Sequence, residues 1–144
     1  MFEPLDPRQV ARIESVHRGF LYQHLYAVGC LLLAGENAIR VVTIERDEDI
    51  ELEDSRGNRV YVQVKTRSSP LLPSDISEVL ERFEAIRSEH HAGRRPGTGS
   101  FVIISNAVPG PELRARLGKG PLSAGVILLW PGAPAAGMGC LPPA

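Results

Sequence analysis

Seven of the ten residues from 45 to 54 are acidic, and a lysine ends the β-branched segment that follows them. Gly57 and Asn58 separate the two segments, and this pair of residues is typical of a hairpin turn. Clustered carboxylates repel one another unless a cation lies among them, and a lysine withdrawn from water needs a charged partner. The stretch therefore predicts either a cation site or a set of ion pairs between two strands.

The alternation of side chains along the two strands decides which residues meet. Successive side chains of a strand point to opposite faces of a sheet. Strands expected at about 48–53 and 59–66 then have one aliphatic face, and the other face gathers Asp49, Gln63 and Lys65 within a few ångströms. Hard oxygen ligands of this kind favour Mg²⁺ or Mn²⁺ over zinc. The alternative is an exposed hairpin, whose cross-strand ion pairs each contribute roughly a few tenths of a kcal/mol.

Helices and further strands must hold this hairpin in place. Asp6 and Pro7 suit the start of a helix, and apolar residues at helical spacing carry it to about Ala34. Ser74 is the expected cap of a second helix that ends near His91. The remaining expected elements are strands at 39–44, 100–105 and 125–130 and a short helix at 110–118. The order α-β-β-β-α-β-α-β predicts an α/β fold with a sheet flanked by helices.

Composition narrows the class of protein. The chain has 144 residues, 43% of them hydrophobic and 23% charged, which is ordinary for one globular domain. Cys30 and Cys140 lie far apart and match no zinc spacing. A signal peptide and a membrane-spanning apolar run are both absent from the sequence, so a cytoplasmic protein without membrane contact is expected.

The charges and the tail indicate how the chain is organised. The acidic cluster contrasts with residues 59–119, where ten Lys and Arg face six Asp and Glu, a segregation that suits a metal site facing a polyanion. Residues 132–144 are rich in Pro, Gly and Ala and show no pattern that would pack. We therefore expect a domain at 1–131 and a linker or tail at 132–144 that leads to a C-terminal domain.

Three segments together resemble a known family: "RGFLYQHLYAVGCLL" in the first helix, "IERDEDIEL", and "YVQVKT". An acidic residue followed by Q-x-K on the next strand is similar to the PD-(D/E)XK nuclease superfamily, in the Mrr-like variant with glutamine at the second position. More narrowly, residues 13–83 resemble the N-terminal double-stranded DNA endonuclease domain of CBASS- or STAND-type anti-phage defence effectors. This resemblance implies a restriction-endonuclease-like fold, with a central mixed β-sheet flanked by helices.

The resemblance also implies roles for the hairpin residues. Asp49 corresponds to the metal-binding acid, and Gln63 to a neutral metal ligand or a group that orients water. Lys65 corresponds to the catalytic lysine, which polarises the attacking water or stabilises charge on the phosphate. Glu45 has the parity of Asp49 and is a candidate further metal ligand; a solvated carboxylate is the alternative. Because Gln63 is neutral, weaker metal binding is expected than with an acid at that position.

Two residues of the first helix are further candidates. Gln23 lies on the same helical stripe as Phe20 and Ala27, so its amide is expected to point toward the sheet. The resemblance places Gln23 at the edge of the active site with a catalytic role; a purely structural hydrogen bond is the alternative. Glu14 lies one stripe away, and whether it joins the metal site stays open.

Three arginines are candidates for binding nucleic acid. Arg67 follows the catalytic lysine, and Arg94 and Arg95 lie on the loop after the second predicted helix. Contact with DNA phosphates is the functional interpretation, and solvated loop charge is the alternative.

As a whole, the resemblance implies a Mg²⁺- or Mn²⁺-dependent endonuclease that cleaves duplex DNA with little sequence specificity. A non-catalytic nucleic-acid-binding or protein-binding module with the same fold, and an RNA-cleaving enzyme, are the alternatives. Residues 1–130 contain no P-loop and no glycine-rich nucleotide fingerprint. Control is therefore expected from a fused or associated C-terminal sensor domain that brings nuclease domains together as a homo-oligomer.

Overall fold

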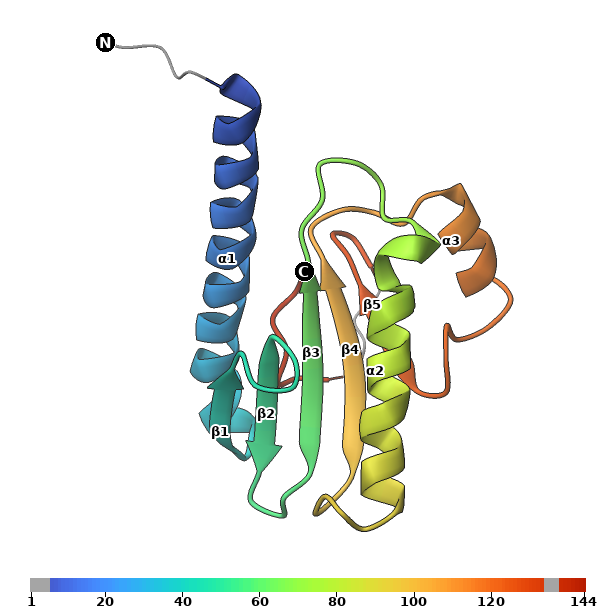
Figure 1. Ribbon diagram of the computed structural model, residues 1–144. Helices are drawn as coiled ribbons and strands as arrows, with labels where there is room; N and C mark the ends of the chain where they lie inside the picture. Colours follow the sequence, from blue (N-terminus) through green and yellow to red (C-terminus); the bar gives the residue numbers. More distant parts are fainter. Residues whose placement is uncertain (1–5, 134–137) are drawn as a thin grey trace.

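The computed structural model describes residues 6–133 and 138–144. Its elements follow the predicted order (Figure 1). They are α1 (Pro7–Ala34), the 3₁₀ turn η1 (Gly35–Asn37), β1 (Ile39–Ile44), β2 (Ile50–Asp54), β3 (Arg59–Lys65), α2 (Pro73–His91), β4 (Gly99–Ser105), α3 (Pro111–Leu117) and β5 (Val126–Leu129). The predicted strands at 48–53 and 59–66 correspond to β2 and β3, although β2 begins two residues later than expected.

The five strands form one mixed sheet in the order β1-β2-β3-β4-β5. Antiparallel pairing joins β1 to β2 and β2 to β3, and parallel pairing joins β3 to β4 and β4 to β5. Each parallel connection contains a helix, α2 in the first and α3 in the second, as parallel pairing requires. The predicted α/β fold, a central mixed sheet flanked by helices, is confirmed, and it is consistent with a restriction-endonuclease-like architecture.

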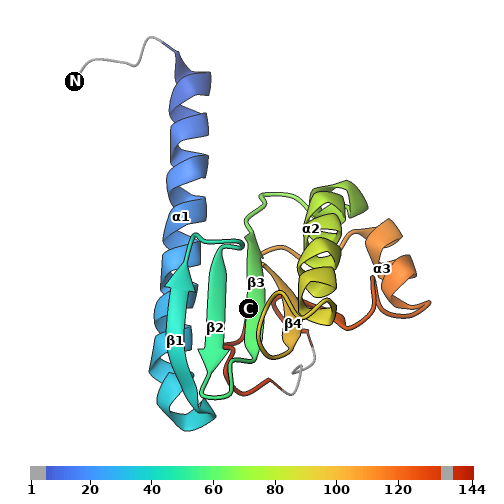
Figure 2. The same cartoon turned by 60° about the horizontal axis from the view of Figure 1, so that its bottom comes forward.

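Two apolar clusters cover the sheet, with α1 and α2 on opposite sides (Figure 2). The first joins the α1 residues Tyr26, Ala27 and Cys30 to the aliphatic side chains of β2 and β3, including Val62. The second joins α2 to the opposite side, including Tyr61. The neighbours Tyr61 and Val62 thus lie in different clusters, which confirms the predicted alternation along β3.

Only part of α1 is buried against the sheet. The N-terminal half of the helix extends past the strands (Figure 1), and the buried residues of α1 are Gln23, Tyr26, Ala27 and Cys30. Nine large apolar side chains between Val10 and Leu32 are instead 36–78% exposed. No helix among the described residues combines the length and apolar composition that crossing a bilayer requires.

The helix starts agree only partly with prediction. The Asp6 carboxylate accepts the main-chain N–H of Arg8 at 2.9 Å and caps α1 as predicted. Ser74 does not cap α2, which begins one residue earlier at Pro73. Proline suits the first helical position, and the Asp75 carboxylate accepts the preceding N–H, that of Leu72, at 2.7 Å.

The end of the chain packs against α1, contrary to the expectation that the tail has nothing to pack. Leu141 is buried in the cluster that contains Tyr26 and Cys30, and the Tyr26 hydroxyl donates to the carbonyl of Pro142 at 2.6 Å. These partners lie more than 100 residues apart, so no local pattern reveals the contact. Residues 134–137, inside the predicted linker, lie outside the described residues, and the C-terminal sensor domain stays a prediction.

Candidate active site

Asp49 lies in a bend of residues 45–49, directly before β2, and not on a strand. The main-chain N–H of Glu45 donates to the carbonyl of Asp49 at 3.0 Å, and Glu45 has a left-handed φ of 55°. Strand alternation does not extend across such a bend. The parity that grouped Glu45 with Asp49 therefore does not apply, and the structure leaves Glu45 exposed.

The carboxylate of Asp49 meets β3 near its C-terminal end. Its Oδ2 accepts the main-chain N–H of Val64 at 2.7 Å and a side-chain N–H of Gln63 at 2.5 Å. Pairing between β2 and β3 ends at Ile50 and Val62. The main-chain N–H of Val64 therefore lies beyond the reach of β2, and the Asp49 side chain accepts its hydrogen bond instead. The structure thus brings Asp49 and Gln63 together, as predicted.

The surroundings of Asp49 disfavour its charged form. Burial raises the pKa of Asp49 above its ordinary value, and the Val64 N–H and the charges of Lys65 and Arg82 only partly oppose this effect. Glu45 adds a small further increase to the pKa of Asp49, so its charge lies within electrostatic reach. A nearby cation would compensate the Asp49 carboxylate.

An ion pair between the buried Glu48 and the exposed Arg82 adjoins Asp49, and neither residue was predicted from the sequence. The Glu48 side chain is fully buried, and its two oxygens accept Arg82 Nε at 3.0 Å and Nη2 at 3.1 Å. Hydrogen bonding to Glu48 raises the pKa of Arg82, and burial raises the pKa of Glu48 against the opposing effect of Arg82. The signal in the sequence is weak: Arg82 directly precedes the buried Phe83 in α2, and Glu48 is one of seven neighbouring acids.

A pocket of about 360 Å³ lies between α1 and the C-terminal end of β3. Gln23 is buried there, as predicted, and its Nε2 donates to the main-chain carbonyl of Asp49 at 3.4 Å. Glu14 does not line this pocket. The lining residues are Ser15, Val16, Gly19, Phe20, Gln23, Asp49, Gln63, Val64 and Thr66.

Lys65 is the last residue of β3 and is half-buried. Alternation along β3 directs its side chain to the same face as Gln63. Its charge lowers the pKa of Asp49, yet no described carboxylate lies within 4.0 Å of its ammonium nitrogen. The ammonium group is therefore near the site without an ion-pair partner among the described residues.

Arg67 and Arg95 both form ion pairs within the domain. Arg67 Nη1 lies 2.5 Å from the carboxylate of Asp75 at the start of α2, close in sequence to the end of β3. Arg95 Nη1 lies 2.7 Å from the carboxylate of Asp47, in the bend before β2. Each side chain would have to exchange this partner for a phosphate in order to contact DNA.

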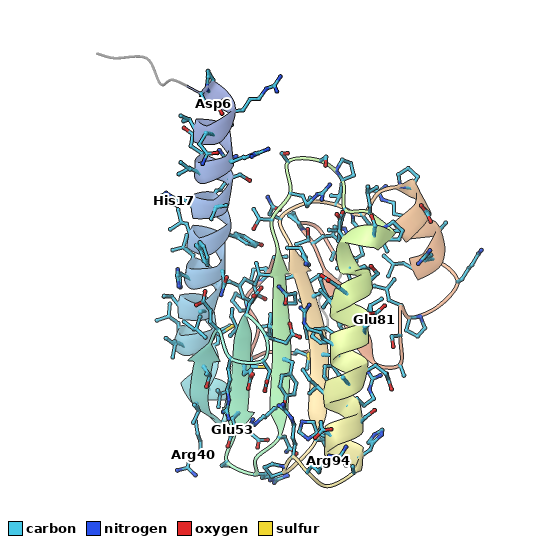
Figure 3. All side chains as sticks on the ribbon, in the orientation of Figure 1. Asp6, His17, Arg40, Glu53, Glu81 and Arg94 are labelled. Atoms are coloured by element: carbon cyan, nitrogen blue, oxygen red, sulfur yellow. The ribbon has the colours of Figure 1, made fainter. Side chains whose placement is uncertain are left out.

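Arg94 lies apart from the other candidates. It pairs with Glu89 at 2.7 Å, and both side chains are exposed. Arg94 follows the C-terminal end of α2 (Figure 3), beside the N-terminal ends of β3 and β4, so the length of the sheet separates it from Lys65. The structure therefore does not bring Arg94 together with the pocket residues.

The oxygens around Asp49 suit a hard divalent cation. Among residues 6–133 and 138–144, no three His, Cys, Asp or Glu side chains converge to hold a metal ion. The Gln63 Nε2 group, however, lies 2.5 Å from Asp49 Oδ2 and 3.4 Å from the carbonyl oxygen of Val64. A weakly positive NH₂ group thus occupies the space where a carboxylate and a carbonyl converge, and these are donors that Mg²⁺ and Mn²⁺ prefer. The residues fit such a cation once this NH₂ group is displaced.

Comparison with protein families identifies the domain. The family model described as "Cap4, dsDNA endonuclease domain" matches residues 14–105. These residues run from α1 to the end of β4 and make up more than half of the chain. The chain belongs to the Cap4 endonuclease family. This confirms the resemblance seen in the sequence, and the matched range includes Gln23, Asp49, Gln63 and Lys65. The Cap4-type domain described here is thus a nuclease module, and its family acts on double-stranded DNA.

A solved structure titled as a protein of unknown function, AF1548, is also similar to the Cap4-type domain. The two chains are 20% identical with a TM-score of 0.46, over 76% of this chain and 60% of the other. This chain therefore spans about three fifths of the length of that protein. Comparison with curated protein sequences gave no match.

Proposed function

We propose that the domain is a Mg²⁺- or Mn²⁺-dependent endodeoxyribonuclease that cleaves duplex DNA with little sequence specificity, as a cytoplasmic effector of anti-phage defence. Membership of the Cap4 endonuclease family supports DNA cleavage. The observation that carries the metal dependence is the Asp49 carboxylate, whose pKa burial raises and which lines a pocket beside Lys65 and Gln63. A carboxylate whose burial is only partly compensated, at the edge of a pocket, is a candidate cation site.

In this proposal Asp49 is the principal metal-binding group, with Gln63 and the exposed Glu45 as further candidates. A bound Mg²⁺ or Mn²⁺ supplies positive charge for the phosphate in the transition state and lowers the pKa of a coordinated water. Gln23 holds the main chain of Asp49 through its 3.4 Å hydrogen bond and so positions the bend that carries the carboxylate.

Lys65 is the proposed catalytic lysine. Its charge lowers the pKa of Asp49, so the ammonium group lies within electrostatic reach of the carboxylate, and no ion pair with a described residue engages it. A fixed positive charge beside the scissile phosphate stabilises the charge that develops on its oxygens during cleavage. The same ammonium group is suited to donate a hydrogen bond to the attacking water.

DNA binding is proposed to depend on phosphate contacts by Arg67, Arg94 and Arg95. No base-reading motif is visible in the sequence, so affinity should come mainly from charge and fall steeply with salt. Arg67 and Arg95 are the better placed, because their ion-pair partners lie at the start of α2 and in the bend beside Asp49.

Activation is proposed to require association of nuclease domains under the control of a C-terminal sensor domain. The outward face of α1 supports such contact between copies. Exposed apolar residues on this face are separated by steps of three or four residues, or by sums of such steps, which is the spacing with which helices pack on one another. They include Val10, Leu21, Val28 and Leu31. Nine large apolar side chains of α1 are 36–78% exposed, and an interface between copies would cover them.

The test of the proposal is cleavage by the chain fused to an unrelated obligate dimer. Duplex DNA and RNA of the same sequence are incubated with this fusion, with Mg²⁺ in one arm and EDTA in the other. Cleavage of the duplex DNA only in the presence of Mg²⁺ is the expected result. Binding of DNA without cleavage in every arm would instead identify a non-catalytic binding module, and cleavage of the RNA alone would identify a ribonuclease.

A further inference from the structure

The guanidinium of Arg82 connects a fully buried carboxylate to the Gln63 amide. Both oxygens of Glu48 bind the guanidinium, at 3.0 and 3.1 Å, and the Glu48 side chain is 0% exposed. The same Nη2 that bonds Glu48 also donates to Gln63 Oε1 at 2.8 Å. Removal of Arg82 would leave a carboxylate buried without a partner, so Glu48 holds the guanidinium in place.

This connection determines which way the Gln63 amide faces. A guanidinium has only donors, so the amide group nearest Arg82 must be the carbonyl oxygen. The NH₂ group then faces Asp49 Oδ2, which can only accept. The opposite orientation would place NH₂ against the guanidinium and the carbonyl oxygen against the carboxylate, and both contacts would be repulsive.

The orientation matters for the metal site. The oxygen of Gln63 is the amide atom that can ligate Mg²⁺ or Mn²⁺, and Arg82 turns this oxygen away from Asp49. The NH₂ group meanwhile occupies the space between Asp49 Oδ2 and the carbonyl of Val64. We propose that Arg82, anchored by Glu48, is a positioning residue that keeps Gln63 from ligating the metal, and that metal binding requires the amide to turn and release Arg82.

This inference rests on the proposed metal dependence, and it predicts a gain where a structural role predicts none. Arg82→Lys retains the positive charge beside Glu48 but loses the planar group that bridges to Gln63. The amide then turns without breaking a hydrogen bond to a guanidinium, so Mn²⁺ should bind about tenfold more tightly, since a net hydrogen bond to a charged group corresponds to about a tenfold change or more. Electrostatics alone predict no such gain, because the charge is unchanged.

Two measurements on the 144-residue chain test the proposal. Titration calorimetry with Mn²⁺ compares the wild type with Arg82→Lys and with Arg87→Lys, a control on the same helix whose arginine pairs with Glu84. In metal-free protein, an NMR Overhauser contact between the Gln63 side-chain NH₂ and the Val64 amide proton reports the amide orientation. Both groups donate to Asp49 Oδ2 in the structure, so the contact is expected in metal-free wild type and Arg82→Lys alike, and saturating Mg²⁺ should remove it as the amide turns.

Tighter Mn²⁺ binding by Arg82→Lys, with Arg87→Lys at the wild-type value, supports the proposal. Equal or weaker binding by Arg82→Lys, or an Overhauser contact that survives saturating Mg²⁺, overturns it and leaves the metal dependence intact. No Mn²⁺ binding by the wild type overturns the metal dependence itself, and the turning step with it. If Arg82→Lys is unfolded, the Glu48→Gln/Arg82→Met double variant replaces it with the same expectation, because it removes the buried charge and the bridge together.

Discussion

Replacing Asp49 by Asn and by Ala should separate its structural contribution from its role in metal binding. The carboxylate accepts two donors on one oxygen, the main-chain N–H of Val64 and the NH₂ of Gln63. Asn retains an oxygen that can accept from both donors, loses the charge, and has an NH₂ group in place of the other carboxylate oxygen. Ala leaves both donors without an acceptor, and the residues that carry them are only 8% and 9% exposed.

The size of the difference follows from these two bonds. A buried donor without an acceptor costs about 1–3 kcal/mol, and the adjoining pocket admits water, so about 1 kcal/mol for each donor is appropriate. Asp49→Ala should therefore be about 2 kcal/mol less stable than Asp49→Asn. For a chain of this length, that difference corresponds to a melting temperature roughly 6 °C lower.

The wild type should differ from Asp49→Asn in its pH dependence. Because burial raises the pKa of Asp49 in the folded state, the folded protein binds the proton more tightly than the unfolded chain does. The wild type therefore loses stability as pH rises from the ordinary Asp value through the raised pKa. Asp49→Asn lacks this loss, so in metal-free buffer it should be at least as stable as the wild type at neutral pH, with an advantage that shrinks in acid.

Calorimetric melting of the three proteins in EDTA measures these differences, and Mn²⁺ titration of separate, EDTA-free samples measures metal binding. Both variants should lose Mn²⁺ affinity, whereas only Asp49→Ala should melt early. Equal melting temperatures for Asp49→Ala and Asp49→Asn would refute the structural reasoning. Equal Mn²⁺ affinity in wild type and Asp49→Asn would remove Asp49 from the metal site.

Three further predictions concern other parts of the domain. Lys65→Ala should reduce cleavage at least about 100-fold while the Mn²⁺ dissociation constant stays at the wild-type value, and a weaker metal complex would contradict the assigned role. Leu141→Ala should cost about 2–4 kcal/mol, because this buried side chain packs on α1, and unchanged thermal melting would show that the tail contributes nothing. In DNA-binding titrations, Arg67→Ala should make the fall of log affinity with log salt concentration less steep by about 0.9. Arg94→Ala, measured alongside, tests whether the arginine at the far end of the sheet contacts a phosphate.

Local patterns in the sequence predict most of the fold. Asp6 and Pro7 mark the start of α1, and the alternation along β3 separates Tyr61 from Val62 on the two faces of the sheet. The same alternation, together with a short turn, brings Gln63 toward the acidic segment. These features depend on neighbouring residues and on pairing within one hairpin, so they are visible in the sequence.

Contacts between distant segments are not visible in this way. The burial of Leu141 depends on α1 residues more than 100 positions away, and the ion pair of Glu48 with Arg82 joins the bend to α2. The bend itself was missed because an acidic run carries no signal that distinguishes an extended strand from a turn. A left-handed φ at Glu45 is unusual for a residue with a side chain, so composition gave no reason to expect it.

The central claim is that Asp49 and a divalent metal together enable this domain to cut duplex DNA. The most direct test of this claim is the conversion of supercoiled plasmid. The dimer-fused wild type and its Asp49→Asn variant are each assayed with Mg²⁺ and with EDTA. Asn keeps both hydrogen bonds of the carboxylate, so a loss of activity cannot be attributed to misfolding. Nicked and linear plasmid are expected only from the wild type with Mg²⁺. Equal conversion by Asp49→Asn, or by the wild type in EDTA, would contradict it.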